Sequence, residues 1–183
     1  MALNYLVCDD YDANLEYTCD PCNTVENGGV RSLLLIKKGT TVAVPLNLVG
    51  LTAQIEAGNV IVLPATRGTF DGGTPKMGTG FGSKKEKLLG ADYVLQVKAP
   101  TYADNAEFMA AVEKIEDWNL AFATATQMHI VTADVTITTK APVEEAIDTD
   151  VLWNMECKWF SQSKPVITPV SPIVTLLKCF TIA

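Results

Sequence analysis

The sequence predicts a mainly β protein with one flanking helix (α+β), folded as an antiparallel β-sandwich or split barrel with a long glycine-rich loop. Several segments alternate apolar and polar residues with the period of two that is typical of half-buried strands. One segment combines a helical period with a capping pattern. The connections are mostly short, which favours antiparallel neighbours, and 183 residues are enough to bury a core without disulfides.

The chain divides into an N-terminal arm or loop, residues 1–29, and a β domain, residues 30–183. The first part is polar and contains the turn-forming runs Asp-Pro and Asn-Gly-Gly. The domain then begins with three expected strands, "VRSLLLIKKG", "TTVAVPLN" and "NVIVLPATRG". Gly39 and Pro64 end the first and the third, and Pro45 indicates an edge position or an early stop for the second.

The middle of the chain predicts a strand followed by a helix. In "ADYVLQVKAP", residues Tyr93, Leu95 and Val97 share one face and polar residues share the other. The helix is expected over about 103–118, because Asp104 suits the N-cap and Glu107 completes a capping box. Its apolar face contains Phe108, Val112 and Ile115, with Met109 beside them, and its end is expected near Trp118.

The last third returns to strands. "MHIVTADVTITTK" is rich in β-branched residues, and "DTDVLWNMECKWFS" alternates Trp153, Met155, Cys157 and Trp159 with polar residues. Core packing is the first interpretation of this tryptophan stripe. A final strand is expected from Ile173 to Ile182. The whole pattern gives about eight strands and one helix.

Composition narrows the classes of function. The net charge of −7 argues against sequence-independent binding to nucleic acid, which needs clustered cations. The longest apolar runs, "SLLLI" and "NVIVLP", are too short to cross a bilayer, so we expect no membrane partner. The N-terminus shows no secretory signal, which favours synthesis in a reducing cytoplasm. An odd count of five cysteines there favours free thiols.

The stretch from Phe70 to Gly90 contains six glycines and a lysine cluster. It is neither a Walker loop nor a dinucleotide fingerprint, because no Gly-Lys-Ser/Thr and no βαβ unit follow. Two interpretations stay open: a mobile hairpin tip, or an excursion that orders against a neighbouring subunit. In the second, the lysines would meet acidic patches on that subunit. The contact residues would be Phe70, Lys76, Met77, Phe81, Lys84, Lys85 and Lys87.

We find no catalytic constellation, and we expect neither an enzyme nor a cofactor. "CDPC" has zinc-knuckle spacing, with Cys19, Cys22 and Cys8 as candidate ligands. A structural zinc site needs four ligands, usually as two close pairs, and no second pair exists. The simpler interpretation is a turn with two thiols. The lone His129 has no nucleophile or second histidine beside it in the pattern, so we expect a structural or interfacial role.

Four carboxylates precede the tryptophan strand. They suit a solvated acidic loop or, alternatively, a negative surface that faces a lumen or a partner's lysines. These residues are Glu144, Glu145, Asp148 and Asp150.

The order of these elements resembles a known family. Strands, a long glycine-rich excursion, "GADYVLQVKAPTY", a capped helix ending in Trp118 and "DVLWNMECKWFS" follow one another from Val30 to Pro165. This order is similar to the tail-tube class of ring-forming virion proteins of tailed bacteriophages and to related tubes of contractile injection machines. In that family a β-sandwich or split barrel carries one flanking helix, subunits join their sheets into a ring, and a long loop reaches the adjacent ring.

The resemblance implies a function and a set of partners. The chain would be a virion structural protein, assembled in the host cytoplasm, whose partners are copies of itself and other virion proteins. DNA would pass without specific binding. Closure of sheets into a ring also removes exposed strand edges. The cysteine-bearing N-terminus departs from the family, and would be an extra arm or the mark of a different ring, connector or decoration protein.

Two other functions compete with this one. The first is a small β-sandwich binding module, monomeric or dimeric. The second is a small enzyme or a Cys-ligated zinc protein, in which Cys19, Cys22 and His129 would converge.

Overall fold

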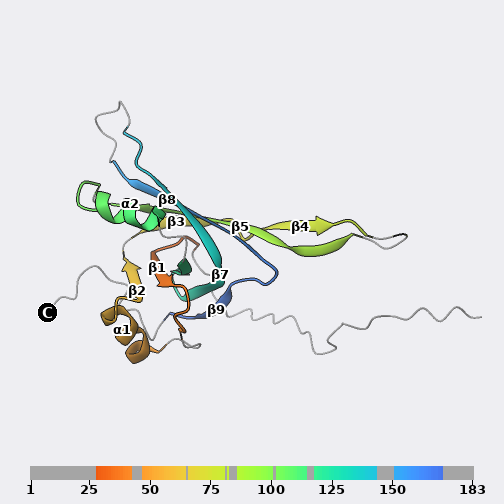
Figure 1. The fold of residues 1–183 in the computed structure, drawn as a ribbon, viewed down its shortest axis with the longest axis horizontal. Helices are drawn as coiled ribbons and strands as arrows, with labels where there is room; N and C mark the ends of the chain where they lie inside the picture. Colours follow the sequence, from red (N-terminus) through yellow and green to blue (C-terminus); the bar gives the residue numbers. More distant parts are fainter. Residues whose placement is uncertain are drawn as a thin grey trace, which may run out of the picture.

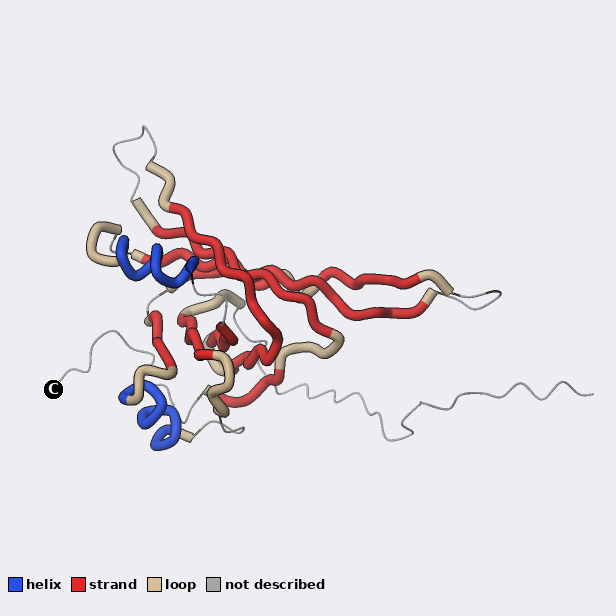
Figure 2. Tube along the Cα trace, viewed as in Figure 1, coloured by secondary structure: helices blue, strands red, loops and turns tan. Residues whose placement is uncertain are grey.

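The structure is a computed structural model, and it describes residues 28–42, 47–64, 66–80, 82, 86–100, 102–114, 118–143 and 151–170. These residues form nine strands and two helices (Figures 1 and 2). In chain order they are β1 (Ser32–Lys37), α1 (Leu48–Glu56), β2 (Val60–Leu63), β3 (Arg67–Phe70), β4 (Thr74–Gly78), β5 (Lys87–Ala99), α2 (Ala106–Lys114), β6 (Trp118–Ala123), β7 (Gln127–Lys140), β8 (Trp153–Ser161) and β9 (Val166–Pro169).

The strands outnumber the helices, and all strand pairs among the described residues are antiparallel. This confirms the predicted mainly β, antiparallel fold class. The sheet runs in the order β2-β1-β6-β7-β8-β5-β3, with β4 on β5 and β9 on β7. Strand β7 belongs to two layers. Its first half, Gln127–Ile130, pairs with β9, and its second half, Thr136–Lys140, pairs with β8. The chain thereby forms one layer from β2, β1, β6 and β9 and a second from β8, β5, β3 and β4.

A short backbone contact closes the strands into a barrel. Val30, just before β1, exchanges two hydrogen bonds with Gly68 of β3, at 2.9 and 3.0 Å. The amide of Thr66 adds a third by donating to the carbonyl of Arg31 at 3.0 Å. A Cβ at position 68 would collide with the carbonyl oxygen of Gln96, so glycine permits the close approach of β3 to β5.

The main core lies between the two layers. As the alternation predicts, Tyr93, Leu95 and Val97 of β5 are buried, and so are Met155, Cys157 and Trp159 of β8. From the opposite layer, Leu33 and Leu35 meet them. His129 packs in this region, with its ring stacked on Phe122 at 4.7 Å between centroids.

A second apolar cluster lies on the other face of β1. There Leu34 and Ile36 pack with Leu51 of α1 and with Met128 and Ile130. Burial of both faces explains why β1 reads as an unbroken apolar run. Helix α1 thus covers the outside of one layer, and the outer face of the other layer, β3-β5-β8-β7, carries polar side chains.

Helix α1 corrects the expectation of a single helix. The segment "TTVAVPLN" was expected to be a strand, yet residues 40–42 and Asn47 lie outside any strand, and 43–46 lie outside the described residues. The side chain of Asn47 caps α1 by accepting from the amide of Val49 at 2.9 Å. Burial of Leu51 against the second cluster then stabilises a helix of only nine residues.

Helix α2 is shorter than the predicted 103–118. It begins at Ala106, so the residue directly before it is Asn105 and not Asp104. The side-chain amide of Asn105 donates a hydrogen bond to the carbonyl of Pro100 at 3.3 Å. Met109 and Val112 face the main core as predicted. Trp118 does not end the helix but begins β6, because pairing with β1 and β7 buries its side chain.

Two further differences concern strands. No strand was expected at β3 or at β9, which are four residues each. The glycine-rich stretch was expected to be a loop, whereas Thr74–Gly78 and the residues from Lys87 onwards are paired strands. The strand expected from Ile173 to Ile182 lies outside the described residues.

Candidate functional site

A two-stranded ribbon projects from the barrel. Strand β5 is 13 residues long, but β8 pairs only with Ala91–Ala99. The first four residues of β5, Lys87–Gly90, continue past the end of β8 and pair with β4 alone within the described residues. We call β4 together with Lys87–Gly90 the hairpin arm. Figures 1 and 2 show it extending far beyond the other strands.

The base of the hairpin arm is tightly packed. The carboxylate of Asp71 accepts hydrogen bonds from the amides of Gly73 and Val94, at 2.9 and 3.1 Å. It thereby fixes the connection from β3 to β4 against β5. Gly73 has a positive φ of 93° and lies directly on the ring of Tyr93, where no side chain would fit. The direction in which the arm leaves the barrel is therefore set by ordered contacts.

A β-bulge changes the register within the hairpin arm. Lys76 lies opposite Gly90 and Met77 lies opposite Leu88, so Leu89 is the extra residue of β5. A Cβ at Gly78 would lie 2.9 Å from the Leu89 side chain, which places Leu89 over Gly78. Bulges of this kind twist a ribbon and redirect its side chains.

The bulge leaves apolar side chains exposed on both faces of the ribbon. Met77 and Leu88 are directly opposed, share one face, and are 51% and 58% exposed. Leu89 lies on the other face and is 45% exposed. Phe160, at the end of β8, is 44% exposed at the base of that second face. We call these four residues the arm patch.

A lysine borders the arm patch. The ammonium of Lys76 lies 5.5 Å from the ring centroid of Phe160 and 3.6 Å from the carboxylate of Asp92. The cation thus sits over the aromatic ring in the geometry of a cation–π contact. It orders Phe160 without covering the rest of the arm patch.

Several residues expected at a contact between copies fall within or near the hairpin arm. Lys76, Met77 and Lys87 belong to it. Phe70 lies at its base and packs inward, with its ring 5.9 Å from that of Trp159 and 4.9 Å from that of Phe122. The other expected contact residues, Phe81, Lys84 and Lys85, lie outside the described residues, as do the acidic residues Glu144, Glu145, Asp148 and Asp150.

Three residues of the arm patch were not among the expected contact residues: Leu88, Leu89 and Phe160. The alternation of β8 does carry a signal, because Phe160 follows Glu156 and Lys158 on the outward face. An apolar residue at an outward position of an alternating strand is a reason to look for a partner.

No protein-family model, curated protein or solved structure matches this chain.

None of the three candidate metal ligands, Cys8, Cys19 and Cys22, is among the described residues. Among the residues that are described, no group of three or more His, Cys, Asp or Glu side chains is arranged to hold a metal ion. Cys157 is buried in the core, and burial raises the pKa of its thiol to about 12, so it stays protonated near neutral pH.

None of the helices in the described ranges has the length and apolarity needed to cross a bilayer.

Proposed function

We propose that this chain is a non-enzymatic virion structural protein that self-assembles into rings or a tube, similar to phage tail-tube proteins. The hairpin arm is the contact between copies, and the exposed arm patch is the observation that carries the proposal. Other virion proteins are its further partners, and DNA passes without specific binding.

The two apolar faces of the hairpin arm support a contact that encloses the ribbon. A two-stranded ribbon has no core of its own and is marginally stable in water. Met77 and Leu88 on one face, and Leu89 with Phe160 on the other, leave four large side chains about half exposed. Because each side chain is already about half buried, covering the rest stabilises a complex by up to about 0.8–1.5 kcal/mol per side chain. Contact with neighbouring copies on both faces removes this surface from water.

Open strand edges support assembly as well. Among the described residues, β2 pairs only with β1, β9 pairs only with β7, and β4 pairs only with β5. Each therefore presents one row of backbone groups that a second chain can pair with. Because β2 and β9 lie at opposite ends of the same layer, head-to-tail pairing of copies would extend that layer around a closed ring.

The test replaces the apolar contact of the hairpin arm by charge. Met77→Asp combined with Leu88→Asp is expected to leave a folded subunit, because neither side chain belongs to the core clusters. Sedimentation velocity is expected to show assemblies for the natural chain and single subunits for the double variant.

Val143→Asp is the matched control, because Val143 is 71% exposed but follows the last residue of β7, Lys140, outside the hairpin arm. It should assemble like the natural chain. If the Met77→Asp, Leu88→Asp variant assembled at the same concentrations as the natural chain, the proposal would be refuted.

A further inference from the structure

The outer face of the layer β3-β5-β8-β7 forms a shallow groove of about 510 Å³. No helix residue of the described part lines it, whereas α1 packs on the outside of the opposite layer. Most of its lining residues are outward residues of four adjacent strands with polar or charged side chains, and the inward residues Val97 and Met155 also line it. The charged side chains suit this face to a charged ligand.

Three cations line up across this groove, which we call the basic row. Arg67 of β3 lies directly opposite Lys98 of β5. Lys98 lies opposite Asn154 of β8, and Asn154 lies opposite Lys140 of β7. All three cations line the groove and are exposed. With strands about 4.8 Å apart, the row crosses the face over about 15 Å.

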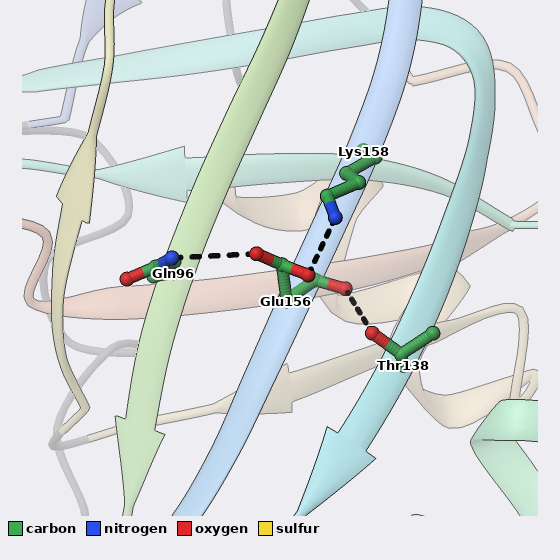
Figure 3. Close-up of polar contacts among 4 residues, drawn as sticks. All are labelled: Gln96, Thr138, Glu156 and Lys158. Carbon is green, nitrogen blue, oxygen red and sulfur yellow. Dashed lines mark hydrogen bonds and ion pairs between the residues drawn. The ribbon is translucent and has the colours of Figure 1, made fainter.

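The one carboxylate lining the groove is already engaged. Glu156 accepts from the ammonium of Lys158 at 2.7 Å and from the side-chain amide of Gln96 at 3.3 Å (Figure 3). The hydrogen bond from Lys158 is the main cause that lowers the pKa of Glu156, so this carboxylate is charged near neutral pH. Within the described residues no ion pair includes Arg67, Lys98 or Lys140.

Two cations of the basic row repel each other across paired strands, whereas Lys140 is attracted to Glu156. Like charges on directly opposed strand residues repel each other, and Arg67 and Lys98 are such a pair. Screening by water and salt reduces this repulsion but does not reverse it. A bound polyanion offsets it, and carboxylates spaced along an extended chain match cations spaced along the row.

This chain contains a segment of the complementary charge. Residues 1–27 carry six Asp and Glu side chains and no Lys or Arg, so they account for most of the net charge of −7. The segment also joins the fold beside the groove. Val30 pairs with Gly68, the neighbour of Arg67 in β3, and β3 forms one wall of the groove.

We propose that the acidic segment from Asp9 to Glu26 docks across the basic row of its own chain. Tethering at Val30 favours its own groove over that of another copy, because the local concentration of a tethered segment is high. The Gly28-Gly29 pair permits a turn just before Val30, because Gly29 has a positive φ of 110°. The inference is independent of the proposed self-assembly.

The test is zero-length carbodiimide cross-linking of the full chain at about 50 mM salt. At this ionic strength the Debye length lies between about 10 and 30 Å, so attraction between the charges is only partly screened. The reagent joins carboxylates to lysines that they contact. Mapping by mass spectrometry is expected to show residues 9–26 coupled to Lys98 and Lys140 in preference to Lys37, Lys114 and Lys164. The preference should disappear at about 1 M salt.

Two variants and an isotope mixture complete the test. Arg67→Gln with Lys98→Gln should lower the yield at the remaining Lys140 about threefold or more, while Lys37→Gln with Lys114→Gln should not. In an equal mixture of unlabelled and ¹⁵N-labelled chains, cross-links should join residues of the same label. Cross-links in equal yield at all lysines would overturn the basic row as the docking site. Cross-links between chains of different label would overturn docking within one chain.

Discussion

Gly90 lies directly against Phe160 at the point where the hairpin arm leaves the barrel. A Cβ at position 90 would lie 2.6 Å from Cζ of Phe160 and 2.7 Å from the carbonyl oxygen of Ser161. The φ of Gly90 is 151°, a backbone conformation that side chains disfavour. One glycine thus lets β5 pass the end of β8 and continue into the hairpin arm.

Gly90→Ala is therefore expected to lower the free energy of unfolding by about 1–3 kcal/mol. The ring of Phe160 can rotate away, but the backbone oxygen of Ser161 cannot move without disturbing the pairing of β8 with β5. Urea unfolding followed by tryptophan fluorescence measures the change.

The control for this variant is Gly50→Ala. Gly50 lies in α1, and a Cβ there meets no atom within 4 Å. Alanine is expected to raise the free energy of unfolding by about 0.5–1 kcal/mol. If both alanine variants changed stability alike, the close contact at Gly90 would have no energetic consequence.

A carboxylate adds to the packing of Met109 and Val112 in attaching α2 to the barrel. Oε1 of Glu113 accepts a hydrogen bond from the amide of Thr139 in β7 at 2.6 Å. Glu113→Ala is expected to lower the free energy of unfolding by about 1–2 kcal/mol, since the bond is charge-assisted but exposed. Glu113→Gln keeps an acceptor and should lose less. If both variants lost the same free energy of unfolding, the charge of Glu113, and not this hydrogen bond, would be the source of the stabilisation.

The buried thiol of Cys157 gives a chemical prediction. Because its pKa is raised to about 12, the reactive thiolate is scarce at pH 8. Iodoacetamide should leave the Cys157 peptide unmodified in the folded chain and modify it fully in urea, as read by mass spectrometry. Modification at equal rates in both states would contradict its burial.

The same thiol links stability to pH. Its ordinary pKa of 9.0 applies to the unfolded chain, and the folded value is about 12. Below pH 9 both states keep the proton and the thiol has no effect. Between pH 9 and 12 the unfolded chain releases its proton first, so stability falls by up to about 1.4 kcal/mol per pH unit. Cys157→Ala should show a shallower fall over this range.

Period-two strands were predictable because each buries one face and exposes the other. The alternation of β5, β7 and β8 comes directly from that asymmetry. Helix α1 was not predictable in the same way. Its β-branched residues Val49, Thr52 and Ile55 weaken the helical signal, and the helix is stabilised by burial of Leu51 against residues distant in sequence, such as Met128.

The candidate site was predictable only in part. Composition pointed to the stretch that contains Lys76 and Met77, and both belong to the hairpin arm. The exposure of Leu88 and Leu89 follows from the register in which β8 pairs with β5. This register leaves Lys87–Gly90 beyond the last pair, Ala91 with Ser161. Such long-range pairing has no local sequence pattern.

The central claim is that copies of this chain complete one another's strand edges and cover the hairpin arm. Negative-stain electron microscopy of the concentrated full chain tests it most directly. The account predicts closed rings, single or stacked into tubes, at concentrations where light scattering gives a molar mass many times that of one chain. Single particles with the molar mass of one chain at every concentration would contradict it.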